Sequence, residues 1–83
     1  MNKIKNAKEA KELQKASRER IIKDSIALAL EQIAREASMG QEETELICIL
    51  GTEYEIKKEL EVLGFKCKKL NENGKYVKII IWW

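Results

Sequence analysis

The last nine residues, KYVKIIIWW (75–83), constrain the fold of this chain more than any other segment. β-Branched and aromatic residues at this density are typical of a strand that needs cover on both faces. Because successive side chains of a strand point to opposite faces, the odd-numbered residues up to Trp83 share one face and the even-numbered residues up to Trp82 share the other. Both sets are apolar toward the end of the chain, so we expect helices or another subunit to cover each face.

A long helix is expected before this strand. Asn6 and Glu9 match a capping box, in which the asparagine caps free amides and the glutamate reaches back. No glycine or proline interrupts the chain until Gly40, which suits a C-terminal cap. The apolar stripe typical of a packed helix face is dense only in the second half of this stretch. We therefore predict a helix over residues 6–38, and we expect residues 1–20 to project from the domain or to lie against another subunit.

The segments between the long helix and the terminal run predict a strand, a helix and a second strand. Residues 46–50 are wholly apolar and read as a short strand. Thr52 and Glu55 then repeat the capping pattern at the start of a helix. A lysine-rich strand is predicted over residues 65–70, and residues 71–74 form a hairpin turn, because Asn-Gly tolerates the positive φ of tight turns.

The element order, helix-strand-helix-strand-strand, predicts an α+β fold with a single domain over residues 1–83. A strand-helix-strand unit normally makes a right-handed crossover between parallel strands, whereas the hairpin makes the last strand antiparallel to the strand before it. The last strand is the most apolar, so we place it at the centre of a split β-α-β unit with a three-stranded mixed sheet. The lysines of residues 65–70 suit an edge strand.

The length of 83 residues limits how much surface one copy can bury. Folding at this size buries only about 60–65% of the surface of the unfolded chain. Two cysteines do not make a disulfide framework, and no metal-ligand pairing is visible. We therefore expect the chain to bind itself as a homo-oligomer, either a dimer or a tetramer.

The sequence carries no sign of export. Its first residues run into charged helix without an apolar signal core, and no apolar stretch approaches the ~20 residues of a membrane span. We expect a cytoplasmic protein without membrane contact. In that reducing setting, Cys48 and Cys67 are interpreted as buried small apolar residues.

The net charge of +2 conceals an uneven distribution. Residues 1–23 carry a net charge of +5, residues 24–63 one of −7, and residues 64–83 one of +4. Basic ends around an acidic middle could hold an anion, or could pair with the middle of a neighbouring subunit.

Cations on the predicted first helix supply a candidate binding site. Three-residue steps separate Lys15 from Arg18 and Arg20 from Lys23, so subsets share a face. With an aromatic ring nearby they could clamp an anionic nucleotide, the cations holding phosphates and the ring stacking on the base. The opposing interpretation is a solvated charged face and aromatic core residues, including Trp82. The candidate ligand-binding residues are Lys15, Arg18, Arg20, Lys23, Tyr76 and Trp83.

Catalytic signatures are scarce. Without histidine the chain can build neither a Ser/His nor a Cys/His pair, nor a His-based metal site. A Gly51-Thr52 corner at a helix start could attract phosphate, but the glutamates of the first turn already occupy the helix dipole. We expect a protein that is not an enzyme and that has no cofactor and no metal.

Five features carry a family resemblance when taken together: the start Ala7-Lys8-Glu9-Ala10, the long helix ending in glycine, the short strand before a Glu/Lys-rich helix, the turn Leu63-Gly64-Phe65 and the closing Ile-Ile-Trp. In this pattern the chain resembles small, mostly uncharacterised proteins of tailed bacteriophages and prophages, although Trp83 extends one residue past their usual ending. The resemblance covers nearly the whole chain and implies a phage accessory protein made in the infected cell, without catalytic residues. Several phage proteins of this size are counter-defence factors that sequester cyclic nucleotides as oligomeric sponges or bind a host protein.

Three functions remain open from the sequence. The first is an oligomeric protein that sequesters a small anionic ligand such as a cyclic nucleotide. The second is an inhibitor or structural accessory that docks a host or virion protein through its long helix. The third is nucleic-acid binding, for which a net charge of +2 and an acidic middle give poor support.

Overall fold

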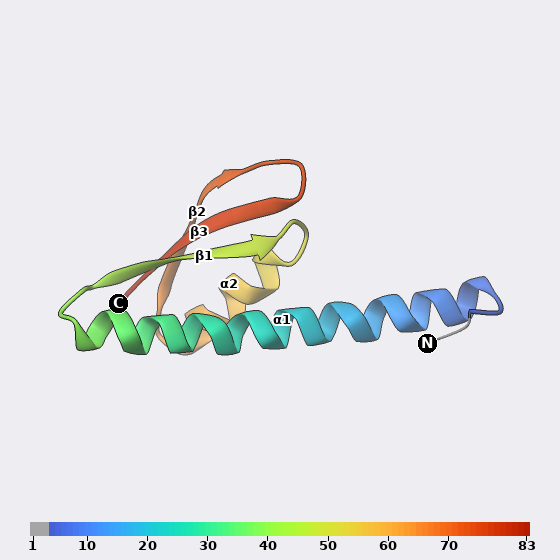
Figure 1. Cartoon of the computed structure of the whole chain (residues 1–83), viewed down its shortest axis with the longest axis horizontal. Helices are drawn as coiled ribbons and strands as arrows, with labels where there is room; N and C mark the ends of the chain where they lie inside the picture. The colour runs from blue at the N-terminus through green and yellow to red at the C-terminus, as the bar shows by residue number, and fades with distance from the viewer. Residues whose placement is uncertain (1–3) are drawn as a thin grey trace.

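The computed structural model describes residues 4–83 and contains two helices and three strands (Figure 1). They are α1 (Ala7–Ser38), β1 (Glu43–Ile49), α2 (Glu53–Val62), β2 (Lys66–Glu72) and β3 (Tyr76–Trp82). The predicted α+β class and element order are confirmed. The chain measures 51 × 23 × 22 Å, and its Cα radius of gyration is 15.0 Å. A compact chain of this length would have a radius of gyration of roughly 12 Å, so the long helix makes the molecule elongated.

Both ends of α1 are capped, and one capping contact differs from the prediction. The Asn6 side chain accepts a hydrogen bond from the amide of Glu9 at 2.9 Å, as expected. The Glu9 carboxylate, however, accepts from the amide of Lys5 at 2.9 Å rather than from that of Asn6. At the other end Gly40 adopts a φ of +82°, which a residue without Cβ adopts readily, and this turn closes the helix.

The three strands form one sheet in the order β1-β3-β2, so the terminal strand is central as predicted. Both strand pairs are antiparallel, and the expectation of a mixed sheet is therefore wrong. The reason is the inserted central strand: β1 and β2 run in the same direction, but β3 separates them and no parallel pair forms.

One face of the sheet packs against both helices and forms the core (Figure 1). On β3, the residues Val77, Ile79 and Ile81 are at most 1% exposed. The phase of the terminal strand predicted from its alternation is therefore confirmed. Every element contributes to the buried apolar cluster, which contains Ala29, Ile33, Leu46, Cys48, Ile56, Leu60, Cys67, Val77, Ile79 and Ile81.

The β1 strand begins at Glu43 rather than at Leu46, and its residues alternate between buried and exposed. Leu46 is buried, whereas Ile47 is 63% exposed and Ile49 is 44% exposed. The prediction of a short, wholly apolar strand missed this alternation, because the isoleucines look like core residues by type alone. In an edge strand with helices on one side only, half of the side chains point away from them.

Thr52 does not cap α2 with its side chain, contrary to the prediction. Its hydroxyl donates to the carbonyl oxygen of Ile49 at 2.7 Å, and the residue is only 5% exposed. Thr52 therefore closes the corner between β1 and α2 instead of satisfying the amides of the helix start.

The hairpin between β2 and β3 is present, but glycine does not shape it as predicted. The side-chain oxygen of Asn73 accepts hydrogen bonds from the amides of Lys75 and Tyr76 at 3.0 and 2.9 Å. Gly74 is not among the described residues with positive φ. The asparagine side chain therefore holds this turn, in the manner of an Asx-turn.

The second face of the sheet is covered by no helix or strand of residues 4–83, and both helices lie on the same side (Figure 1). We call it the open face. Its residues, which are the even-numbered positions of β3 and their partners on β1 and β2, are Glu43, Glu45, Ile47, Ile49, Lys66, Lys68, Asn71, Tyr76, Lys78, Ile80 and Trp82. The helices of one chain therefore cover only one of the two faces that the sequence marked as needing cover.

Cys48 and Cys67 are free and buried, as predicted. Burial raises the pKa of the Cys48 thiol to about 11 and also raises the pKa of Cys67. The two cysteines flank opposite sides of β3, where they pair with Val77 and Ile81. Protonated thiols at these positions are poor nucleophiles, so both act as small core residues.

Replacing Leu60 with alanine tests the packing of α2 on the sheet. Leu60 is fully buried, so Leu60→Ala should lower the free energy of unfolding by about 2–5 kcal/mol through lost burial and a residual cavity. Val62, on the same helix, is 75% exposed, and Val62→Ala should change this free energy by no more than about 0.5 kcal/mol. Denaturant unfolding followed by circular dichroism measures both. Equal losses in the two variants would contradict the placement of Leu60 in the core.

Candidate functional site

The four predicted cations do not converge on one place. Arg18 and Arg20 are two residues apart, which places them about 200° apart around a helix. Arg18 lines a groove beside the β1–α2 corner, Arg20 lines a hollow on α1 itself, and Lys23 lines a hollow beside α2. Lys15 lies three residues before Arg18, on the same side of α1, but in a part of the helix whose hollow is lined by α1 alone. The structure thus leaves Lys15 and Arg18 on one face of α1 and separates them from Arg20 and Lys23.

Arg18 makes the closest polar contacts between α1 and the rest of the fold. One guanidinium nitrogen lies 2.6 Å from Oε2 of Glu55, and the other donates to the carbonyl oxygen of Gly51 at 2.7 Å. The hydrogen bond from Arg18 holds the pKa of Glu55 below its ordinary value. The guanidinium is therefore engaged by protein groups, and its role in the fold is to join α1 to the β1–α2 corner and to α2.

The corner at Gly51 and Thr52 offers little to a phosphate. The amide of Gly51 donates to Oε2 of Glu53 at 2.6 Å, and the amide of Thr52 donates to the carbonyl oxygen of Ile49. Both amides are thus already bonded, and a carboxylate occupies the position that an anion would take. This arrangement removes the physical basis of the phosphate cradle considered from the sequence.

Tyr76 and Trp83 lie at opposite ends of the central strand. Seven residues of extended chain span about 23 Å, so the two rings cannot stack on one base. Tyr76 is 48% exposed on the open face. Trp83 is 38% exposed and packs edge-on against Phe65, with ring centroids 6.4 Å apart. Trp82, half-buried on the open face, is the aromatic residue that the sequence interpretation assigned to the core.

One stripe of α1 changes its chemistry at Arg18. Toward the C-terminal end, three- and four-residue steps connect side chains that belong to the core or pack against it, namely Ile22, Ile26, Ala29 and Ile33. Toward the N-terminal end, steps of the same size connect four cations, with Glu12 and Glu19 beside them: Arg18, Lys15, Lys11 and Lys8. Since a stripe at this spacing keeps one direction, the face that packs on the core becomes a cationic face beyond Arg18.

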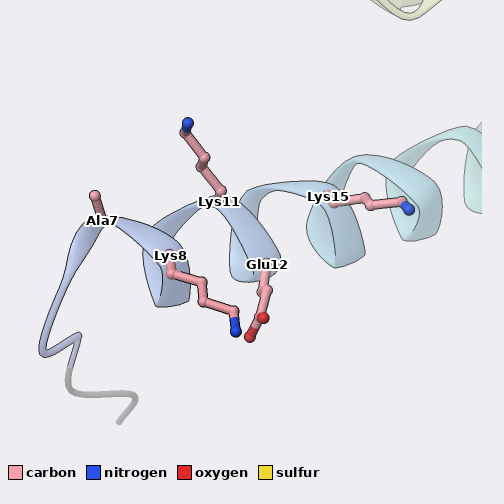
Figure 2. A pocket seen from close by; sticks show the side chains of 5 residues that line it. All are labelled: Ala7, Lys8, Lys11, Glu12 and Lys15. Carbon is pink, nitrogen blue, oxygen red and sulfur yellow. The ribbon is translucent and has the colours of Figure 1, made fainter.

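The first turns of α1 extend beyond the sheet and α2 (Figure 1). We call residues 7–15 the projecting arm. Figure 2 shows Lys8, Lys11, Glu12 and Lys15 spreading from this part of the helix into open space, and the hollow that they line contains no residue of another element. The arm thus presents its cationic side chains on an isolated helix rather than in a pocket.

The projecting arm and the open face are two surfaces that the predicted set of site residues does not describe. For the arm, the signal was present in the sequence: continuing the apolar stripe backwards from Ile22 reaches Lys8. For the open face, the sequence predicts the alternation of β3 and its central position, but it does not predict which residues of β1 and β2 pair with it. Only the register places Ile47 beside Lys78 and Glu45 beside Ile80. The Lys78 ammonium also lies 3.7 Å from the Glu45 carboxylate.

Two further observations concern the described residues 4–83. No group of three or more His, Cys, Asp or Glu side chains in this range is arranged to hold a metal ion. No helix in the same range combines the length and the apolar character needed to cross a membrane.

Comparisons with protein-family models, with curated proteins and with solved structures find no match to this chain. The resemblance to small phage proteins therefore stays a prediction from the sequence, and function must be argued from the surfaces described above.

The contact between Arg18 and Glu55 predicts a dependence of stability on pH. Because the pKa of Glu55 is lower in the folded protein than its ordinary value of 4.5, the contact stabilises the fold above that pH. This stabilisation is lost as the pH falls through the lowered value. Glu55→Gln should therefore be less stable than the wild type at neutral pH, and the difference should shrink below pH 4.5.

Denaturant unfolding at neutral pH and at a pH well below 4.5 measures this difference. Glu59→Gln is the matched control, because Glu59 lies on the same helix and makes no ion pair within residues 4–83. A stability difference for Glu55→Gln that is the same at both pH values would contradict the prediction.

Proposed function

We propose that this chain is a non-enzymatic interaction protein that docks another protein through the projecting arm of α1. The observation that carries the proposal is the change of the α1 stripe from apolar to cationic at Arg18. The apolar part is used by the protein's own core, whereas the cationic part faces solvent along an isolated helix (Figure 2).

The arm is held ready for docking by the rest of its helix. A helical segment as short as residues 7–15 would be marginal in water by itself. Here it continues a helix whose second half is packed on the sheet, and Asn6 caps its free end. A partner would therefore meet a formed helix and would not have to supply the free energy of ordering it.

The chemistry of the arm indicates what kind of surface it fits. Lys8, Lys11 and Lys15 line one side, while Ala10 and Leu13 lie on another side and are only partly exposed. A helix with these two sides suits a groove with acidic groups facing the lysines and a small apolar floor. We infer that the partner is a protein with such an acidic groove.

The proposed biological setting rests on the sequence resemblance alone. Small phage accessory proteins act in the cytoplasm of the infected bacterium, so the partner in that setting is a host or virion protein. A role in counter-defence belongs to the same proposal, because binding a host protein is one way in which small phage proteins inhibit defence.

Sequestration of a small anionic ligand has less support from the geometry. Arg18 is already bonded to Glu55 and Gly51, and Arg20 lies on a different side of α1 from Arg18. Tyr76 and Trp83 lie at opposite ends of β3, so within residues 4–83 no ring lies beside a cluster of free cations. Calorimetry with a panel of cyclic di- and trinucleotides tests this alternative, and we expect no binding. Tight binding that Arg20→Ala weakens, with the fold intact by circular dichroism, would overturn our ranking of the two functions.

Site-specific photo-crosslinking in cells tests docking through the arm. A photoreactive residue at position 11 should give a protein adduct that the same residue at position 62 does not give, because Val62 lies on α2, away from the arm. The double variant Lys8→Glu and Lys15→Glu should reduce the adduct at position 11 at least tenfold, since it reverses two of the cations that face the partner.

The matched control is the double variant Lys58→Glu and Lys75→Glu. It changes the net charge by the same amount, from +2 to −2, but at exposed positions outside α1. This variant should leave the adduct unchanged. Equal losses of adduct in the two double variants would show that only the net charge of the protein matters for binding. The absence of an adduct specific to position 11 would reject the arm as a docking element.

A further inference from the structure

We propose that the open face of the sheet is the interface of a two-fold symmetric homodimer, in which a second copy of this chain covers the face that the helices leave exposed. This inference concerns a different surface from the projecting arm and does not depend on the proposed function. The argument starts from the register of the strands, which fixes how charge is distributed across the open face.

Two rows at one end of the open face run from an acid to an apolar residue to a base. Trp82 pairs with Glu43 on β1 and with Lys66 on β2. In the next row Ile80 pairs in the same way with Glu45 and Lys68. Directly paired residues point to the same face of a sheet, so at this end the open face has an acidic β1 edge, an apolar centre and a basic β2 edge.

The apolar part of the face continues beyond these two rows. Ile47, Ile49 and Tyr76 are 63%, 44% and 48% exposed, although they are of residue types that usually occupy strand interiors. Together with Ile80 and Trp82 they form an apolar strip over β1 and β3. Lys78 lies within this strip, and the other charged residues lie beside it. Exposed apolar side chains gathered in this way are typical of a protein–protein contact.

A second copy of the chain fits this pattern of charge when the two copies are related by a suitable two-fold axis. Two copies that meet face to face about a two-fold axis parallel to the strands place β1 of one copy over β2 of the other. Such an axis preserves position along the strand, so each row meets its own counterpart. Glu43 then lies opposite Lys66 of the second copy, and Trp82 meets Trp82 at the centre.

The alternative face-to-face arrangement is disfavoured by the same charges. A two-fold axis perpendicular to the strands, within the plane of the contact, places β1 over β1 and β2 over β2. This axis also reverses position along each strand, so an axis through the middle of the sheet sets Glu43 and Glu45 opposite Ile49 and Ile47 of the second copy. The glutamates would then lose contact with water without gaining a cation as partner, which is costly. The open face is thus complementary to itself in one of these two orientations, and we assign that orientation to the dimer.

Lys78 is the one cation on the part of β3 that lies in the open face. In the dimer it would approach Lys78 of the second copy, but its ammonium already leans toward Glu45, 3.7 Å away. In each copy the charge of Lys78 is therefore paired with Glu45. Its long side chain can also reach the solvent at the edge of the two facing sheets.

The size of the face sets the strength of the dimer. Three strands about 4.8 Å apart and seven residues long span roughly 14 × 23 Å, or about 320 Å² per copy, which is less than the roughly 800 Å² per partner of a standard interface and is typical of weak, transient contacts. We therefore expect reversible dimerisation that depends on protein concentration. Light scattering over roughly a hundredfold range of concentration should show a mass rising from 9.6 kDa toward twice that value.

Two matched substitutions locate the interface. Ile47→Lys places a charge in the open face, whereas Val62→Lys places the same charge at a similarly exposed position on α2. Ile47→Lys should remain monomeric at the highest concentration, and Val62→Lys should dimerise like the wild type. Both residues are exposed, so both variants should retain the circular dichroism spectrum of the folded chain.

Charge reversal tests the orientation. Within residues 4–83 neither Glu43 nor Lys66 makes an ion pair, so changing either leaves the contacts of the single chain intact. Glu43→Lys and Lys66→Glu should each weaken dimerisation at least tenfold, and combining them should restore it, because the opposed pairs are then attractive again.

Several outcomes would overturn the proposal. A wild-type mass that stays at 9.6 kDa over the whole range leaves the face without a second copy. A dimer or larger oligomer that Ile47→Lys does not disrupt forms through another surface. A double reversal that stays monomeric, while both single variants are folded, rejects the axis parallel to the strands. A different protein held through Ile47 would assign the face to a hetero-partner.

Discussion

The architecture depends on one stripe along α1 and on the place where its chemistry changes. From Ile33 back to Ile22 the stripe is apolar, and the sheet and α2 pack against it. At Arg18 it becomes cationic, and burying lysines without partners would cost more than the packing returns. Arg18 itself marks the border, because its guanidinium is bonded to Glu55 on α2 and to the carbonyl oxygen of Gly51. The apolar length of the stripe thus sets how far the body of the protein extends and where the projecting arm begins.

A helical cover on one side leaves the sheet with unequal faces. α1 and α2 together bury one face, in which Val77, Ile79 and Ile81 are almost completely enclosed. The opposite face keeps five apolar side chains, two of which lie between a glutamate of β1 and a lysine of β2, and no helix or strand of residues 4–83 covers it. A small domain buries a limited fraction of its surface, and association of two copies is a common way to increase it. The open face therefore exists because both helices lie on the same side of the sheet. The projecting arm exists because α1 is longer than the sheet that it packs on.

These two surfaces, rather than a pocket, are where the described residues offer chemistry to a partner. The polar groups near the β1–α2 corner are already bonded to each other, from the amide of Gly51 to the guanidinium of Arg18. The cysteines are buried and their thiols are protonated at neutral pH. What stays accessible is a cationic helix and a self-complementary sheet face. In the proposed dimer the sheets would meet at the centre and each chain would carry its own arm, so one assembly could engage two copies of a partner.

The sequence by itself determined the elements, their order and the phase of the terminal strand. Local signals suffice for this, since Asn6 begins α1, Gly40 and Gly64 follow its end and that of α2, and alternation along β3 separates Ile79 from Ile80. Most errors occurred where a contact partner is distant in the chain: Glu55 binds Arg18 instead of completing a cap, and Ile47 faces solvent because the helices lie on the other side of β1. The dispersal of the predicted cations was likewise decided by tertiary structure, because helical rotation separates Arg18 from Arg20 and only the fold determines which of them meets another element. Spacing along a chain fixes directions within one element, but it does not fix what stands opposite to them.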